Sequence, residues 1–422
     1  MKTRLIFGLR MIFLVLVPYN LYSQGESALP FLLITSSPEG NGMAGISASV
    51  LTDNAMASIA NPGQLGLQSL TNFLSASTYA PKTQWLPAFQ VSDLTYLASS
   101  VNVGVNLRRV IPLPIPISVG LGYSHVFLNL GKFVETVGDP TPGTTYDTYE
   151  QSDGYTLGLG VDYFIRAGIG FTAKNVKSIL GPPSSAIRVG TAEVSTTDFG
   201  TIVQVPTVAI ISKLHGGPVT LFPNVEPIFD ITLGYARSNL GDKDVEYSGI
   251  GRGGPLPRTA TIGLSWKAGL ISHAVSQGWE IFSVTIAREA LDVLVGTSAA
   301  GSWSYQNGLG DLQVFDNLIL GKSNQEVWLR KGFQIGLGEI LMFRIGSLRA
   351  PFHLNLDTDG YSLRLGGVFK LFVATSTGEF SAPILNFIIH HIDFQYDHAS
   401  ETQLDGGPRS GTTYSALNLI IK

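Results

Sequence analysis

The sequence contains no cysteine in 422 residues, and only 14% of its residues are charged. Without cysteine the chain has no disulfide, no thiolate metal ligand, no cysteine nucleophile and no lipoprotein anchor. The charged fraction is well below the roughly 25% of a typical soluble domain. The formal net charge is −4, which argues against a nucleic-acid partner because nucleic-acid-binding surfaces are strongly basic.

Long apolar runs are also missing, except near the start of the chain. No other run approaches the roughly 18 apolar residues that a membrane-spanning helix needs, although the mean hydropathy is +0.23. Glycine, phenylalanine and tyrosine are abundant instead, with 48, 22 and 15 residues. An apolar chain without helical spans is typical of a protein that crosses the membrane with strands.

The first 68 residues are expected to form two parts. Residues 1–23 have the basic start, the apolar run at 11–17 and the following polar residues of a secretory signal peptide. The alternative, a single membrane anchor, is disfavoured because the apolar run is short. Residues 24–68, rich in small side chains, are expected to form a compact plug-like segment.

A turn near the end of this segment is a candidate structural site. It consists of Asn61, Pro62 and Gly63. Pro62 fixes the backbone, and Gly63 allows a positive φ in the turn.

Residues 69–422 are expected to be all-β. In the stretch 360–372, large apolar side chains alternate with Ser362, Arg364 and Lys370, so the cations share one face. Unpaired cations are very costly in a dry core but can face a wet lumen. Similar alternation predicts fourteen strands: 70–80, 91–110, 115–135, 152–164, 167–178, 203–214, 226–240, 257–268, 278–292, 326–339, 341–350, 360–372, 386–398 and 411–421.

The connections between these strands alternate between two sides. If the first strand runs outward, the connections on the outer side are longer on average, and both ends of the sheet lie on the inner side. An even strand number with short inner turns predicts a transmembrane antiparallel β-barrel of about 14 strands. Closure of the barrel also removes the sheet edges that lipid does not tolerate.

Charged residues at inward positions are candidate lumen residues. Two interpretations are open, and the first is favoured: they solvate a wet interior, or they select a ligand. The residues are Arg344, Arg364, Lys370, Lys267, Asp162 and Asp393, with Asp397 beside them.

No motif predicts catalysis, a metal or a cofactor. The glycines of 249–254 match a dinucleotide fingerprint, but Pro255 follows them where a helix would have to start. His390 and His391 are neighbours on an expected strand, so they point to opposite faces and do not share a metal. The protein is therefore not expected to be an enzyme.

Aromatic residues in the expected outer loops are further candidates. Trp85 lies in the first outer connection, and Trp303 and Tyr305 lie in the longest one. Three roles remain open for them: anchors at the membrane interface, contacts for a protein partner, or a gate for hydrophobic ligands.

Four stretches carry a family resemblance. They are the turn at 61–65, the hairpin at 85–96, the strand, loop and strand at 237–258, and the late strands at 331–372. They resemble the PorV family of the type IX secretion system, a relative of the FadL long-chain fatty-acid transporters. The chain departs from the family at Gly63, where alanine is usual, and at its end, which is not aromatic.

The resemblance implies an outer-membrane barrel of fourteen strands with an N-terminal plug. As a PorV-like protein it would receive secreted cargo through the cargo's C-terminal domain and present it to a sortase-like surface protein. The alternative is a FadL-like passive transporter of hydrophobic small molecules, and a purely structural surface protein is a third possibility. An apolar pocket next to residues 42–67 would favour transport. The other expected partner is outer-membrane lipid.

Overall fold

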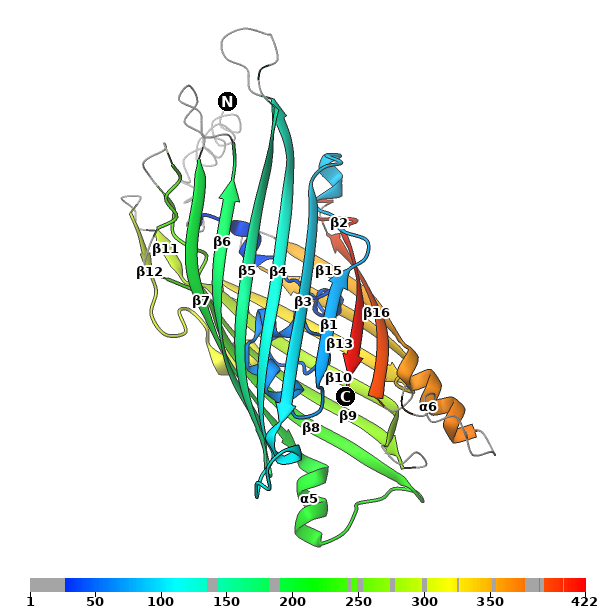
Figure 1. Ribbon diagram of the computed structural model, residues 1–422. Coiled ribbons are helices and arrows are strands. Elements are labelled where there is room, and N and C mark those ends of the chain that lie inside the picture. Colours follow the sequence, from blue (N-terminus) through cyan, green and yellow to red (C-terminus); the bar gives the residue numbers. More distant parts are fainter. Residues whose placement is uncertain are drawn as a thin grey trace, which may run out of the picture.

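A computed structural model describes residues 27–134, 143, 145–181, 190–241, 244–248, 253–273, 278–297, 302–324, 326–350, 354–375, 387, 391–404 and 406–422. In these residues, fourteen antiparallel strands close into a barrel (Figure 1). The predicted barrel of about 14 strands is therefore confirmed. The expected signal peptide, residues 249–252 and His390 lie outside the described residues.

The wall closes where the first strand pairs with both the last strand and the next one along the chain. The wall strands are β1 (Leu74–Tyr79), β3 (Thr95–Asn106), β4 (Ile117–Val134), β5 (Thr145–Asp162), β6 (Arg166–Ile179), β7 (Thr191–Pro206), β8 (Val225–Leu240), β9 (Thr259–Ser272), β10 (Trp279–Val293), β13 (Val327–Leu337), β14 (Leu341–Arg349), β15 (Asn355–Arg364), β16 (Ile392–Gln403) and β17 (Thr413–Ile421).

The remaining elements lie inside the barrel or at its ends. Two residues, β2 (Thr83–Gln84), extend the sheet at β3, and β11 (Val295–Thr297) pairs with β12 (Trp303–Tyr305). The helices are η1 (Pro30–Leu33), α2 (Pro38–Asn41), α3 (Ala57–Ala60), α4 (Gly63–Gln68), η2 (Pro87–Phe89), η3 (Leu107–Arg109), α5 (Thr207–His215), η4 (Phe315–Leu320) and α6 (Leu365–Thr375). None of these described helices is long and apolar enough to cross a bilayer.

The outside of the wall is apolar. On β5, Tyr155, Leu157 and Leu159 are exposed, whereas the residues between them face the lumen and are buried. The other strands repeat the pattern, as the alternation predicts for lipid on one side and a polar lumen on the other. Further exposed apolar residues are Val101, Val103, Leu121, Ile169, Phe171, Phe229, Leu233, Phe282, Ile286, Phe343, Ile345, Tyr361, Leu363, Phe394 and Leu417.

The two ends of the barrel differ. We call the end at which Leu74 and Ile421 pair the inner end, and the opposite end the outer end. Strands β4 and β5 have 18 residues each, whereas β14 has 9 and β1 has 6. A strand of about 9–11 residues crosses the membrane, so the wall around β4 and β5 extends beyond it at the outer end (Figure 1).

Helices occupy residues that were assigned to several predicted strands, and two of these strands are wrong over their second halves. The strand expected at 203–214 ends at Pro206, and α5 follows it; β7 begins earlier, at Thr191. The strand expected at 360–372 ends at Arg364, and α6 follows. In α6 the apolar residues recur at helical spacing as well as in alternation, so the short pattern did not distinguish the two structures.

Candidate functional site

Residues 27–72, which we call the inner segment, lie inside the barrel (Figure 1). The segment contains η1, α2, α3 and α4; α4 contacts β3 to β7 on one side of the wall, and α2 contacts β15 to β17 on another. The lumen is therefore largely filled by a part of the chain that precedes the first wall strand.

Glycines allow α4 to lie directly on the wall. A Cβ atom added to Gly66 would collide with the carbonyl oxygen of Leu159 in β5. In the other direction, a Cβ atom added to Gly160 or Gly168 would collide with the carbonyl oxygens of Gly66 and Gly63. The backbone of the inner segment thus occupies space that side chains would take in an ordinary wall.

The same arrangement extends around the lumen. Ten strands contribute a glycine at which a Cβ atom would meet the inner segment at 3.0 Å or less. We call this set the glycine ring: Gly104, Gly120, Gly158, Gly160, Gly168, Gly170, Gly200, Gly234, Gly263, Gly332, Gly346 and Gly360.

The turn at 61–63 connects the segment to β7. The side-chain amide of Asn61 donates to the carbonyl oxygens of Ala48, at 2.8 Å, and Thr201, at 3.0 Å. Pro62 immediately precedes α4. Gly63 lacks the expected positive φ; its role is close approach, because an added Cβ atom would lie 3.0 Å from the carbonyl oxygens of Gly168 and Gly200.

Ion pairs also hold the inner segment. The Arg344 side chain is fully buried, and its guanidinium lies 2.7 Å from the Glu39 carboxylate and 3.9 Å from that of Asp397. Arg330 lies 2.7 Å from Glu289 and donates to the carbonyl oxygen of Gly45 at 3.0 Å. Both arginines therefore join a wall carboxylate to the segment.

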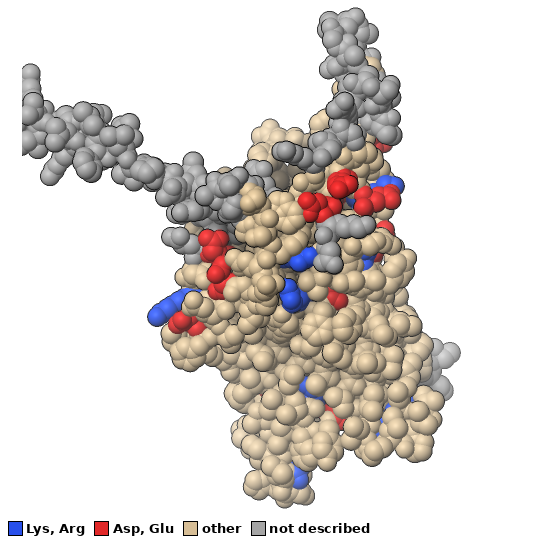
Figure 2. All heavy atoms as spheres, turned by 90° about the vertical axis from the view of Figure 1, so that its left-hand side faces the viewer, with Lys and Arg blue, Asp and Glu red and all other residues tan. Residues whose placement is uncertain are grey.

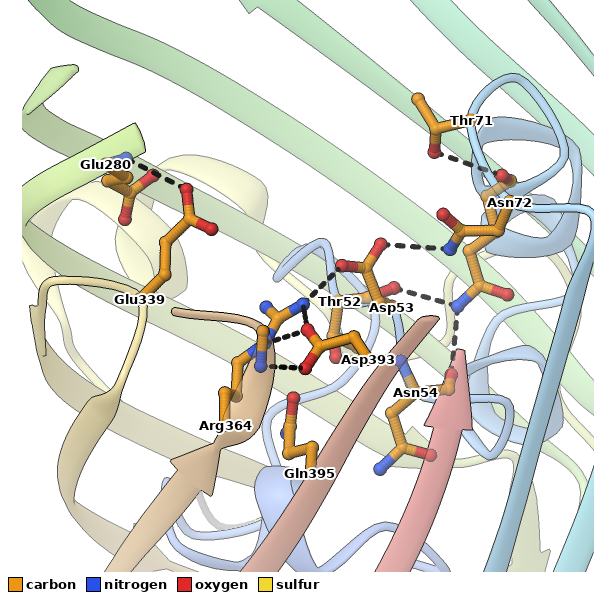
Figure 3. Close-up of polar contacts among 12 residues, drawn as sticks. Thr52, Asp53, Asn54, Thr71, Asn72, Glu280, Glu339, Arg364, Asp393 and Gln395 are labelled. Carbon is orange, nitrogen blue, oxygen red and sulfur yellow. Dashed lines mark hydrogen bonds and ion pairs between the residues drawn. The ribbon is translucent and has the colours of Figure 1, made fainter. Parts of the chain in front are cut away.

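A third arginine makes the same connection near the inner end (Figure 3). The Arg364 guanidinium lies 2.6 Å from the Asp393 carboxylate of β16 and 3.1 Å from the Asp53 carboxylate of the segment. Asn72 donates to the other oxygen of Asp53 at 3.0 Å. These contacts bring together two of the predicted lumen residues, Arg364 and Asp393, and a third charge from the segment.

The other predicted lumen charges are placed differently. Lys267 lies 2.6 Å from Glu280, and Asp162 lies 3.1 Å from Arg166. Lys370 was expected on a strand, and this is wrong: it lies in α6 at the inner end, 2.7 Å from Glu339. The cause is the helix that replaces the second half of the predicted strand.

The two carboxylates of the segment have opposite pKa shifts. Burial is the main cause that raises the pKa of Glu39, and the nearby Asp397 adds to it; Arg344 opposes both. Burial would also raise the pKa of Asp53, but the Lys422 and Arg364 cations outweigh it and lower this pKa. Asp53 is thus held ionised, whereas Glu39 shares one guanidinium with a second carboxylate.

Two cavities flank the inner segment. The inner cavity has a volume of about 480 Å³ and a polar lining that includes Asp53, Asp230, Lys267 and Arg364. The outer cavity has a volume of about 100 Å³. The two share no lining residue, so the inner segment separates them.

The lining of the outer cavity has two sides. The inner segment contributes large apolar side chains, among them Phe31, Met56 and Ile59. The wall contributes mainly hydroxyl and charged side chains: Ser124, Ser152, Lys174, Ser238, Thr259, Thr261, Glu289 and Arg330. A small compound with an apolar body would find its apolar contacts on the segment.

An aromatic cluster fills the lumen beside this cavity. The Trp85 ring lies 6.1 Å from the Tyr96 ring and 6.5 Å from the Tyr414 ring, and Tyr79 packs against both tyrosines. Trp85 is only 9% exposed. Trp85 lies in the first outer connection, as expected, but it is buried because the chain after β1 turns into the lumen. Its role toward a ligand or partner remains a prediction.

Trp303 and Tyr305 lie together on β12, in the longest outer connection. Their rings are 5.3 Å apart and half-buried. The Tyr305 ring lies 3.5 Å from the Arg258 guanidinium carbon, and its hydroxyl accepts from the Leu256 backbone at 2.8 Å. These contacts pack the loop against the one before β9, and a role in binding a partner or ligand stays a prediction.

Sequence reasoning missed the glycine ring and the pair of Arg330 with Glu289. The alternation of Gly158 and Gly160 with large apolar residues was visible, and it was the one signal that small inward positions needed filling. Nothing in the sequence paired Glu289 with an arginine 41 positions away. In the part of the chain that the structure describes, no three His, Asp or Glu side chains are grouped to hold a metal.

No protein-family model and no curated protein matches the sequence. Among solved structures, the chain is similar to the Ralstonia pickettii toluene transporter TbuX, with 11% identity, 91% of this chain and 96% of that chain covered, and a TM-score of 0.37. It is similar to a Pseudomonas aeruginosa FadL homologue, with 10% identity, coverage of 94% and 98%, and a TM-score of 0.37. Similarity this low gives no information about the ligand.

Proposed function

We propose that the protein is an outer-membrane barrel that binds small hydrophobic compounds in the outer cavity and passes them across the membrane. The apolar side of that cavity, formed by Phe31, Met56 and Ile59 of the inner segment, is the observation that supports the proposal. It lies next to the segment, where a pocket would favour transport over docking. The closed apolar wall and the expected signal peptide support the outer-membrane location.

The size of the cavity limits the compound. A volume of about 100 Å³ is smaller than the roughly 150 Å³ apolar cavity that accommodates benzene. A single small ring fits after a modest adjustment of side chains, whereas a long acyl chain needs a larger rearrangement. Passage further requires the inner segment to yield, because the segment separates the outer cavity from the inner one.

The test is a binding measurement on the purified, folded barrel in detergent with fluorobenzene as the probe. Binding is followed by the broadening of the fluorine NMR line of fluorobenzene when the barrel is added. Ile59→Trp fills the cavity, and we expect it to lower the apparent affinity at least tenfold. Leu233→Trp places the same side chain on the exposed outer face of β8 and is the matched control. Equal binding by the wild type and both variants would contradict the proposal.

A docking role in type IX secretion is the second candidate, and one observation favours it. Strands β5, β6 and β7 extend beyond the lipid-facing region and carry a polar groove that faces outward. Figure 2 shows charged side chains gathered toward this end of the molecule. The groove is lined by Gln151, Asp153, Asn175, Val176, Lys177, Glu193, Val194 and Ser195.

Deleting the gene separates the two candidates. If docking is the role, secretion of cargo proteins and their attachment at the surface should stop, and Lys177→Glu with Glu193→Lys should impair both. If transport is the role, secretion should be unchanged and uptake of the small hydrophobic compound should fall. Unchanged secretion in the deletion strain would remove the docking candidate.

A further inference from the structure

On β5 the apolar band on the outside of the barrel is shorter than a membrane requires. Its outward apolar residues run from Tyr155 to Val161, and the next outward residue toward the outer end is Asp153. Asp153 lies 2.9 Å from His125 and accepts from the Tyr123 hydroxyl at 2.7 Å, which marks a polar boundary.

The length of this run gives the height of the band. Six residue steps at about 3.4 Å and a tilt of about 40° give roughly 16 Å along the membrane normal, whereas the apolar band of such barrels is about 25 Å tall. The outer boundary is fixed by Asp153, so the missing roughly 9 Å must come from below the inner ends of the strands.

Apolar side chains are present at that position. We call residues 107–116, 163–165 and 207–224 the inner rim; the last of these contains α5, which hangs below the strands in Figure 1. Leu214 is 71% exposed and Val110 is 74% exposed. The other exposed apolar residues of the inner rim are Ile111, Tyr163, Phe164, Ile165, Ile211, Leu221 and Phe222.

The charges of the inner rim have one sign. It contains Arg108, Arg109, Lys213 and His215 and no aspartate or glutamate, although the whole chain has more acidic than basic residues. Lys213 donates to the Tyr163 carbonyl at 2.9 Å and lies 5.6 Å from the Phe164 ring centre. Within the described residues, none of the three Arg and Lys side chains has an ion-pair partner.

This combination matches a phospholipid surface. Helices with exposed apolar residues and nearby cations lie in the headgroup region, where the apolar side chains enter the acyl boundary and the cations meet anionic phosphates. The inner rim continues the lipid-facing wall directly, so it shares that wall's surroundings. On the far side of the barrel α6 repeats the apolar part of this feature, with Leu365, Val368 and Phe372 exposed.

We propose that the inner rim lies in the headgroup region of the phospholipid leaflet at the inner end. Its apolar side chains complete the lipid-facing band, and Arg108, Arg109 and Lys213 bind anionic phospholipid headgroups. The partner is the lipid surface itself, and the proposal does not depend on whether the barrel transports a compound or docks cargo.

The depth of the inner rim is tested with the full chain reconstituted in vesicles of phosphatidylcholine and phosphatidylglycerol. Because the protein has no cysteine, Leu214→Cys takes a single fluorescent label, and Asp147→Cys on β5 at the outer end, where the side chain is 67% exposed, is the control. Brominated lipid should quench the label at 214 at least threefold more than the label at 147, and aqueous iodide should show the opposite order.

The charges are tested with Arg108→Gln, Arg109→Gln and Lys213→Gln combined. The wild type should retain phosphatidylglycerol over phosphatidylcholine after detergent extraction by several fold, and the triple variant should lose that preference. Lys132→Gln with Lys177→Gln, both exposed at the outer end, is the control and should keep it. Iodide access at 214, protection of 214 from both quenchers, or an unchanged lipid preference in the triple variant would overturn the proposal.

Discussion

The outer and inner halves of the lumen are filled in different ways. In the outer half, the rings of Tyr79, Trp85, Tyr96 and Tyr414 pack together next to a cavity of about 100 Å³. In the inner half, charged side chains line a cavity of about 480 Å³. One inner segment faces both, so the same short chain is apolar on its outer side and ion-paired on its inner side. For this reason the proposed binding site for an apolar compound is the outer cavity and not the inner one.

The largest effect is expected when the inner segment cannot dock against the wall. Gly66→Ala places a methyl group against the Leu159 carbonyl oxygen, and neither backbone can move without disrupting α4 or β5. We expect the folded barrel to lose upwards of about 4 kcal/mol, in the range of the most damaging substitutions. The two cavities should then merge, and single-channel conductance in planar bilayers should rise.

The matched control for that variant is Gly217→Ala. Its added methyl group would meet nothing within 4 Å, so it should leave both stability and conductance unchanged. If Gly66→Ala had the same conductance as the wild type, the inner segment would not be what separates the outer and inner halves of the lumen.

The outer half depends on its aromatic packing. Trp85→Ala removes the ring that contacts Tyr96 and Tyr414, and a large buried aromatic replaced by alanine costs about 3–5 kcal/mol. Urea unfolding of the purified barrel should show this loss. Fluorobenzene binding should change as well, because the cavity beside the cluster would enlarge; a variant with full stability would mean that the cluster is loosely packed.

The inner half depends on its buried charges. Arg364→Gln leaves Asp393 and Asp53 facing each other without their cation, and breaking a buried pair on one side costs about 3 kcal/mol. Arg166→Gln removes a partly exposed cation beside Asp162, and a pair of this kind contributes only about 0–1 kcal/mol. Equal unfolding free energies for the two variants would contradict the expected difference.

The smallest effects on stability are expected from the two carboxylates of the segment, Asp53 and Glu39. Their contributions to the free energy of unfolding change with pH in opposite directions. The lowered pKa of Asp53 gives stability that is complete above about pH 4 and is lost as the pH falls through the lowered value. The raised pKa of Glu39 gives stability that is complete below about pH 4 and is lost as the pH rises through the raised value.

Two conservative variants measure these contributions. Asp53→Asn should cost about 1 kcal/mol at pH 7, since its side chain is partly exposed. Glu39→Gln should change stability little at pH 7, because Asp397 still neutralises Arg344, and it should flatten the dependence of unfolding on pH above about pH 4. A steeper dependence in Glu39→Gln would contradict the assigned shift.

The wall could be predicted from the sequence because its physics is local. Alternation such as Leu157, Gly158, Leu159, Gly160 places side chains on two faces wherever the strand lies, so the fourteen strands follow from pattern alone. The inner ends of two strands were harder to predict. At 207–215 and 365–375 the apolar residues fit a strand and a helix equally, and only the surroundings at the inner end decide between them.

The candidate site was less predictable because it depends on distant partners. Arg344 and Arg364 were identified as inward cations, but their partners Glu39 and Asp53 come from a segment about 300 positions earlier. The glycines of the ring have no side chain, so nothing in the sequence told what fills the space beside them. Trp85 was assigned to the first outer connection, and nothing in the sequence showed that this loop turns into the lumen.

The glycine ring has a consequence for how the molecule is assembled. Sealing the cylinder joins residues 74–79 to residues 416–421, and the strand on one side of this seam follows α4 after only a few residues. The inner segment therefore precedes the first wall strand in the chain. Ten of the fourteen wall strands carry glycines that leave room for the backbone of this segment. If the barrel closed before the inner segment was in place, the space beside these glycines would be empty, and the closed wall would block the segment from entering through the side.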